Sequence, residues 1–132
     1  MKFSRVEHLT QNFSLSEFQS RDGAEMPASV YKNVLKLAAN LETIRGAAGC
    51  SLHINSGYRS PEHNAAVGGA HNSQHLSGNA ADIVPTGGVS VQELHDIIKA
   101  LMDIGHVEAG GLKAYYKNGF VHYDRRGEYT TW

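Results

Sequence analysis

The sequence predicts an α+β fold in which helices flank a small, mainly antiparallel sheet. Two segments, 27–48 and 91–104, repeat apolar residues at helical spacing, and several shorter segments are typical of strands. An Asn-Gly pair at 118–119 is a strong turn signal, so the strands on either side of it are expected to form a hairpin. The order of helices, strand, helix, strand, helix and hairpin is that of an α+β domain.

The composition fits one globular domain spanning residues 1–132. The chain has 41% hydrophobic and 19% charged residues, and its length allows a modest core without disulfides. The formal net charge of -1 predicts no general attraction to nucleic acid or to anionic membranes. The single cysteine, Cys50, excludes an internal disulfide and a multi-cysteine zinc site. No transmembrane helix or signal peptide is evident, so we expect cytoplasmic synthesis without a signal peptide, and a monomer.

The N-terminal third is expected to be helical. Ser14, with Glu17 three residues later, has the pattern of a capping box and predicts the start of a short helix. The segment 27–48 predicts a longer amphipathic helix, with Pro27 in its first turn and Gly49 at its end. Its apolar positions alternate steps of four and three and predict one buried stripe: Val30, Val34, Leu37, Leu41 and Ile44.

The middle of the chain predicts two strands separated by a short helix and a loop. Residues 52–56 alternate apolar and polar side chains, which indicates a strand. A Ser-Pro pair at 60–61 predicts a short helix that stops at the glycines 68–69. The polar, Gly/Ser-rich segment 70–78 is expected to be a loop, and residues 80–84 are expected to form the next strand.

The C-terminal part predicts one more helix and the hairpin. Apolar residues at helical spacing mark the second amphipathic helix: Val91, Leu94, Ile98, Leu101 and Ile104. A Gly-Gly pair at 110–111 then breaks the chain, and 113–116 and 120–124 are the expected hairpin strands. Four aromatic side chains are expected in the core, with a substrate groove as the alternative: Tyr58, Tyr115, Tyr116 and Trp132.

Two histidines and an aspartate have the spacing of a metal site. His75 lies in the loop before a predicted strand, Asp82 lies on that strand, and His122 lies on the last strand. If the two strands are neighbours, the three side chains can converge, because residues two apart on a strand, such as His122 and Asp124, share a face. Three protein ligands with a free fourth position are typical of catalytic zinc. Taken singly, each residue has an ordinary alternative as a loop histidine, a turn aspartate or a half-buried strand histidine.

Three short motifs carry a resemblance to a known family. They are Ser-Gly-Tyr-Arg-Ser at 56–60, Ser-x-His-x-x-Gly-x-Ala-x-Asp at 73–82 and Phe-Val-His-x-Asp at 120–124. Together they resemble the zinc D-Ala-D-Ala carboxypeptidase family, which includes peptidoglycan endopeptidases and shares its fold with the hedgehog signalling domain. The similarity extends from about Phe13 to Arg126, so the resemblance implies a hedgehog-type fold for nearly the whole chain.

The resemblance also implies a set of site residues. One zinc ion per chain is expected, with His75, Asp82 and His122 as its ligands. Arg59 is expected to reach into the cleft and bind the substrate carboxylate or polarise the scissile carbonyl, because a forked and permanently charged guanidinium suits both tasks. Ser73 is expected to hydrogen-bond the substrate, with capping of its own loop as the alternative.

The general base is the part of the site that departs from the family pattern. Many relatives have a histidine or glutamate two or three residues before the last zinc ligand, whereas positions 119–120 here hold glycine and phenylalanine. Asp124 is the first candidate for the catalytic base, because it leaves the same strand face as His122. Asp124 could instead orient His122. His106 and Glu108 are the other candidates.

The resemblance therefore implies a zinc hydrolase that cleaves peptide bonds in cell-wall stem peptides through a zinc-activated water. The expected partner is peptidoglycan or a muropeptide, with neither nucleic acid nor membrane. Carboxypeptidase and endopeptidase action both stay open, as do an enzyme that recycles wall fragments and a phage-encoded enzyme released to the cell wall. A non-catalytic zinc-containing module that binds the cell wall or a protein is the alternative, and an unrelated metal-free domain is a third.

Overall fold

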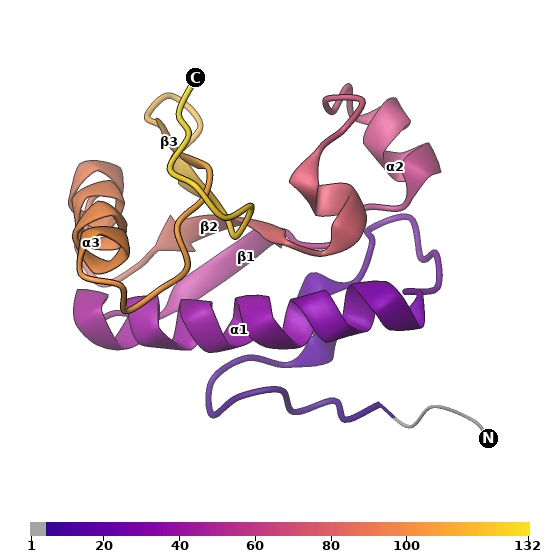
Figure 1. Cartoon of the computed structure of the whole chain (residues 1–132), viewed down its shortest axis with the longest axis horizontal. Helices are drawn as coiled ribbons and strands as arrows, with labels where there is room; N and C mark the ends of the chain where they lie inside the picture. The colour runs from indigo at the N-terminus through magenta and orange to yellow at the C-terminus, as the bar shows by residue number, and fades with distance from the viewer. Residues whose placement is uncertain (1–4) are drawn as a thin grey trace.

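The computed structural model describes residues 5–132 and confirms the α+β fold (Figure 1). Within these residues, every helix is too short or too polar to span a bilayer. The elements in chain order are η1 (Leu15–Phe18), α1 (Ala28–Ala48), β1 (Leu52–Ser56), α2 (Pro61–Ala66), η2 (Gln74–Ser77), β2 (Ala80–Pro85), α3 (Val91–Asp103), β3 (Leu112–Tyr115) and β4 (Phe120–Asp124), where η marks a 3-10 helix.

The four strands form one antiparallel sheet in the order β1-β2-β4-β3. The predicted hairpin is present as β3 and β4, joined by a turn at Gly119. Asp82 on β2 pairs directly with His122 on β4, and Lys113 on β3 pairs with His122 from the other side. Because directly opposed residues share a sheet face, these three side chains leave the sheet on the same side.

The other face of the sheet packs on the hydrophobic core. Four side chains on this face have no exposed surface: Ala81, Ile83, Val121 and Tyr123. The helices α1 and α3 contribute much of the rest of the core, together with residues of η1 and β1, and Figure 1 shows α1 running along one side of the sheet. The apolar stripe predicted for α1 is confirmed, since all five of its residues are buried. The polar pair Asp82 and His122 is therefore directed away from the core side of the sheet.

The expectation of a plain loop at 70–78 is wrong in part, because Gln74–Ser77 forms the 3-10 helix η2. The Ser73 hydroxyl oxygen caps this helix by accepting a hydrogen bond from the His75 backbone N–H at 3.1 Å. Gly78 ends it in the left-handed conformation, with φ of 77°. A helix of four residues is too short to produce an apolar repeat, so periodicity could not reveal it.

Gly78 also supports the packing of η2 on α1, and this gives a testable prediction. A Cβ at Gly78 would lie 2.7 Å from Val30 Cγ1, whereas a Cβ at Gly23, also at positive φ, would meet nothing within 4 Å. Gly23→Ala is expected to cost about 1 kcal/mol through backbone strain alone. Gly78→Ala should cost about 1–3 kcal/mol more, because it overpacks the contact with α1. Urea unfolding of both variants measures the difference, and equal stabilities would contradict the packing role.

Candidate metal centre and active-site cleft

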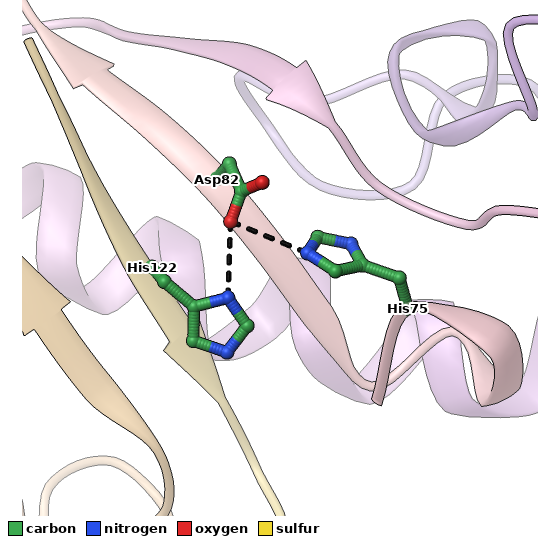
Figure 2. A group of neighbouring side chains, drawn as sticks. All are labelled: His75, Asp82 and His122. Carbon is green, nitrogen blue, oxygen red and sulfur yellow. Dashed lines mark hydrogen bonds and ion pairs between the residues drawn. The ribbon is translucent and has the colours of Figure 1, made fainter. Parts of the chain in front are cut away.

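His75, Asp82 and His122 meet at one point, as the sequence spacing predicts (Figure 2). One nitrogen or oxygen atom from each residue lies within 4.8 Å of the other two. The adjacent strands β2 and β4 supply Asp82 and His122, and η2 brings His75 in from the segment just before β2. All three side chains are buried, with 2%, 7% and 8% of the residue surface exposed in chain order.

The donor atoms fit a zinc ion in chemistry and in spacing. Asp82 Oδ1 lies 3.0 Å from His122 Nδ1 and 3.2 Å from His75 Nε2. Two ligand atoms of a tetrahedral ion with bonds of about 2.0–2.1 Å are about 3.3 Å apart, so small adjustments would accommodate the metal. A set of two imidazoles and one carboxylate leaves the fourth position for water or substrate, as in catalytic zinc sites.

Hydrogen bonds on the far side of each ring orient the two histidines. His75 Nδ1–H donates to the Gly57 carbonyl oxygen at 2.7 Å, and His122 Nε2–H donates to Asp124 Oδ2 at 2.8 Å. These bonds leave the opposite nitrogen of each ring, His75 Nε2 and His122 Nδ1, directed at Asp82. A ligating histidine ordinarily has such a partner on its second nitrogen, which fixes the tautomer.

The charges of the cluster favour a cation. Burial by itself raises the pKa of Asp82, but hydrogen bonds with His122 and His75 outweigh burial and hold that pKa well below its usual range. Burial lowers the pKa of His122, yet its hydrogen bonds to Asp124 and Asp82 outweigh burial and raise that pKa. The cluster thus stabilises positive charge at His122, and a metal ion bound at His122 Nδ1 would meet the Asp82 carboxylate directly, while Asp124 faces the other nitrogen of the ring.

Asp124, the first candidate for the catalytic base, lies behind the His122 ring and does not line the cleft. Its carboxylate is fully buried and also accepts hydrogen bonds from the Arg126 guanidinium at 2.7 and 2.9 Å and from the Gly111 N–H at 2.8 Å. Burial raises the pKa of Asp124, but its hydrogen bonds with His122, Arg126 and Gly111 outweigh burial and keep that pKa well below its usual range. An enclosed and weakly basic carboxylate cannot readily take a proton from water in the cleft, so this position favours the alternative role of orienting His122.

The glycine pair at 110–111 allows the chain to pass closely against Asp124. A Cβ on Gly110 would overlap the Asp124 carbonyl oxygen, and a Cβ on Gly111 would overlap its carboxylate. In the sequence this pair is visible only as a break between two elements. The structure shows that the glycines permit the backbone N–H of Gly111 to reach the carboxylate behind His122.

A cleft of about 580 Å³ opens beside the metal residues. It is lined by Arg59, Ser73, Tyr115, Phe120, Arg126 and Trp132, among others. His106 and Glu108, the other base candidates, do not line it, and Glu108 pairs with Arg125 at 3.0 Å instead. Among the described residues that line the cleft, there is no glutamate and no third histidine.

Arg59 reaches the metal residues, and three side chains hold its guanidinium in place. Its Nε donates to Ser56 Oγ at 3.1 Å, one terminal nitrogen donates to Asn64 Oδ1 at 3.3 Å, and the other donates to Asp82 Oδ2 at 3.3 Å. Asn64 is itself buried, and a Cβ at Gly69 would overlap its amide oxygen. The sequence marks Ser56 only as part of the 56–60 motif and gives no sign of Asn64, because both matter through their contacts with Arg59.

The backbone of the Ser-Gly-Tyr-Arg-Ser motif contributes as much as its arginine. The Gly57 carbonyl oxygen accepts the hydrogen bond from the His75 ring described above. In addition, the Tyr58 N–H donates to the Phe18 carbonyl oxygen at 2.9 Å, and the Arg59 N–H donates to the His75 carbonyl oxygen at 3.0 Å. Gly57 has no room for a side chain, because a Cβ would lie 2.8 Å from Phe18 Cα. The motif therefore joins η1 to η2 and fixes the ring of His75 from behind.

The role of Asp124 in holding His122 gives a second prediction. Asp124→Asn keeps the shape of the side chain but removes the charge that His122 and Arg126 face, and zinc affinity is expected to fall about 10- to 100-fold. Competition with a chromophoric chelator measures the affinity, and thermal unfolding of the metal-free protein checks that the variant folds. Asp96→Asn is the matched control, because Asp96 pairs with His95 at 2.9 Å on the exposed side of α3. Wild-type zinc affinity in Asp124→Asn would contradict the orienting role.

Comparison with protein families agrees with this geometry. The model of the peptidase M15 family matches residues 7–124, which include the three metal residues and Arg59. No curated protein sequence matches the chain. Because the matched span covers most of the 132 residues, the chain belongs to the peptidase M15 family of zinc-dependent metallopeptidases.

Proposed function

We propose that this metallopeptidase hydrolyses peptide bonds in the stem peptides of bacterial cell walls, with one zinc ion held by His75, Asp82 and His122. The convergence of these three ligand atoms beside a cleft is the observation that carries the proposal. Zinc bound there supplies a Lewis acid and a water of lowered pKa. Family membership supports the reaction class, and the motif resemblance supports the cell-wall substrate.

Arg59 is the residue that we assign to the substrate. Its guanidinium lines the cleft and lies 3.3 Å from Asp82 Oδ2, so a carboxylate or carbonyl oxygen bound to it would lie beside the metal residues. The guanidinium stays charged throughout the reaction and can stabilise negative charge as it develops on the scissile carbonyl oxygen. Ser73 also lines the cleft, and its hydroxyl proton is available to a substrate while its oxygen caps η2.

The remaining residues of the centre act by holding others in place. Asp124 and the Gly57 carbonyl keep the N–H groups of His122 and His75 on the far side of the rings, away from the cleft. Neither imidazole is then free to transfer protons to the substrate, since each has one nitrogen hydrogen-bonded and the other directed at the metal position. Asp124 is a positioning residue in this proposal, in place of the catalytic base that the sequence suggested.

A non-catalytic zinc-containing module that binds the cell wall or a protein is the second candidate. One observation favours it: among the described residues lining the cleft, only the three metal residues offer an imidazole or carboxylate. In such a module the metal would stabilise the fold, and the cleft would bind its partner without cleaving it.

Zinc content and hydrolysis of purified peptidoglycan distinguish the two candidates. The wild-type protein is expected to bind one zinc per chain and to release peptide fragments, and His75→Ala should lose both properties because two ligands rarely retain the ion. His95→Ala, which removes a surface histidine of α3, is the control and should retain both. The size of the products separates carboxypeptidase from endopeptidase action. Zinc binding without cleavage would support the binding module, and a wild-type protein without zinc would contradict both candidates.

The support of Arg59 by Asn64 gives a further prediction. Asn64→Ala removes a buried hydrogen-bond partner of the guanidinium, and kcat/KM is expected to fall about tenfold with unchanged zinc content. Asn33→Ala is the control, since the Asn33 amide donates to Ser77 O at 2.9 Å and makes no contact with Arg59. Steady-state kinetics on one stem peptide and the zinc content of both variants provide the measurement. An unchanged kcat/KM in Asn64→Ala would show that Arg59 needs no such support.

A further inference from the structure

The cleft has a second wall on the side away from Arg59. The sheet order β1-β2-β4-β3 places the metal residues of β2 and β4 in the middle, with Arg59 after β1 on one flank and β3 on the other. The register pairs Lys113 with His122 and Tyr115 with Phe120, so all four side chains leave the same sheet face. Tyr115, Phe120 and Trp132 line the cleft, and Lys113 lies beside them on the same sheet face. We call these four residues the aromatic wall.

The aromatic wall is continuous with the metal centre. The Trp132 ring lies edge-to-face against the His122 ring, with centroids 5.1 Å apart, and its Nε1–H donates to the Tyr115 hydroxyl at 3.1 Å. Tyr115 in turn stacks on Phe120, with centroids 4.6 Å apart. A substrate that extends from the metal over β4 and β3 would therefore lie on these rings.

A cation without a carboxylate partner lies on this wall. The Lys113 ammonium is 5.2 Å from the Tyr115 ring centroid and 5.8 Å from that of Trp132, and in residues 5–132 no ion pair neutralises it. The Arg126 guanidinium lies 5.4 Å from the same Trp132 ring, but its charge is balanced by Asp124. Aromatic rings hold such cations and leave the ammonium hydrogens available to an anion. The positive charge is local, because the chain as a whole carries -1.

We infer that the aromatic wall binds a carboxylate of the substrate through Lys113, on the opposite side of the metal centre from the group bound by Arg59. This inference rests on the proposed function and narrows its substrate class. The preferred stem peptides would carry a free carboxylate on the residue that lies over β3 and β4, in addition to the group that faces Arg59. Amidation of that one carboxylate would remove the favourable contact and leave the peptide otherwise unchanged.

A series of stem peptides with each carboxylate converted to a carboxamide, one at a time, tests the inference. Trp132 is the only tryptophan of the chain and belongs to the wall, so its fluorescence reports binding to the zinc-loaded protein whether or not cleavage follows. For one carboxylate, wild type should bind the free form about three- to tenfold more tightly than the amide, as for a partly exposed ion pair. Lys113→Gln should bring that ratio close to one, and Lys113→Arg should preserve it.

Lys117→Gln is the matched control, because Lys117 is an exposed lysine in the turn of the same hairpin. It should retain the wild-type ratio for every peptide. The inference is overturned if wild type binds all amidated peptides as tightly as the free ones, or if Lys113→Gln retains every preference. Cleavage of the same peptides separates the two proposals. If the protein hydrolyses them without a preference that depends on Lys113, the proposed function stands and the carboxylate site does not. If it shows the preference but hydrolyses none of them, the carboxylate site stands and the proposed function does not.

Discussion

The register between β2 and β4 is the constraint on which the rest of this site depends. It places Asp82 directly opposite His122, so two of the three metal residues meet by backbone pairing alone. The same register sends Ala81, Ile83, Val121 and Tyr123 into the core. A slip of either strand by one residue would turn the polar residue of that strand into the core and its apolar residues toward the cleft, so packing and metal binding select the same alignment.

Around this pair, the fold uses groups of little chemical reactivity to hold reactive ones. A backbone carbonyl fixes His75, a buried carboxylate fixes His122, and a serine and an asparagine fix Arg59. Several of these contacts need glycine, at Gly57, Gly69 and the pair at 110–111, because a side chain there would collide with its neighbour. The metal residues therefore depend for their positions on η1, the segment after β1 and the loop before β3.

The elements and the metal residues could be predicted because their signals lie within short stretches of sequence. The helical repeat of α1, the turn at Asn118 and Gly119, and the alternation on β4 are all local patterns. The helix η2 could not be predicted, because a helix of four residues is too short to show a repeat of apolar positions. The assignment of Asp124 as the base shows another limit: alternation indicates the strand face of a side chain, but not whether the side chain lies in front of the imidazole or behind it.

Contacts made by the backbone, or between distant segments, left no signal in the sequence either. Nothing in the residue types shows that the Gly57 carbonyl accepts a hydrogen bond from His75, eighteen positions later. Asn64 and Ser56 are ordinary polar residues until the fold brings both to the Arg59 guanidinium. The aromatic wall likewise needs Trp132 to return to the hairpin, which only the tertiary structure shows.

The donor set of the metal centre has a consequence for where such a protein can work. Its ligand atoms are nitrogen and oxygen, and the one cysteine of the chain, Cys50, lies apart from them. Thiolate ligands are lost to oxidation, whereas imidazole and carboxylate ligands are not changed by the redox poise of their surroundings. A centre of this composition holds its ion equally well in a reducing cell interior and in an oxidising exterior, so redox chemistry places no restriction on the compartment.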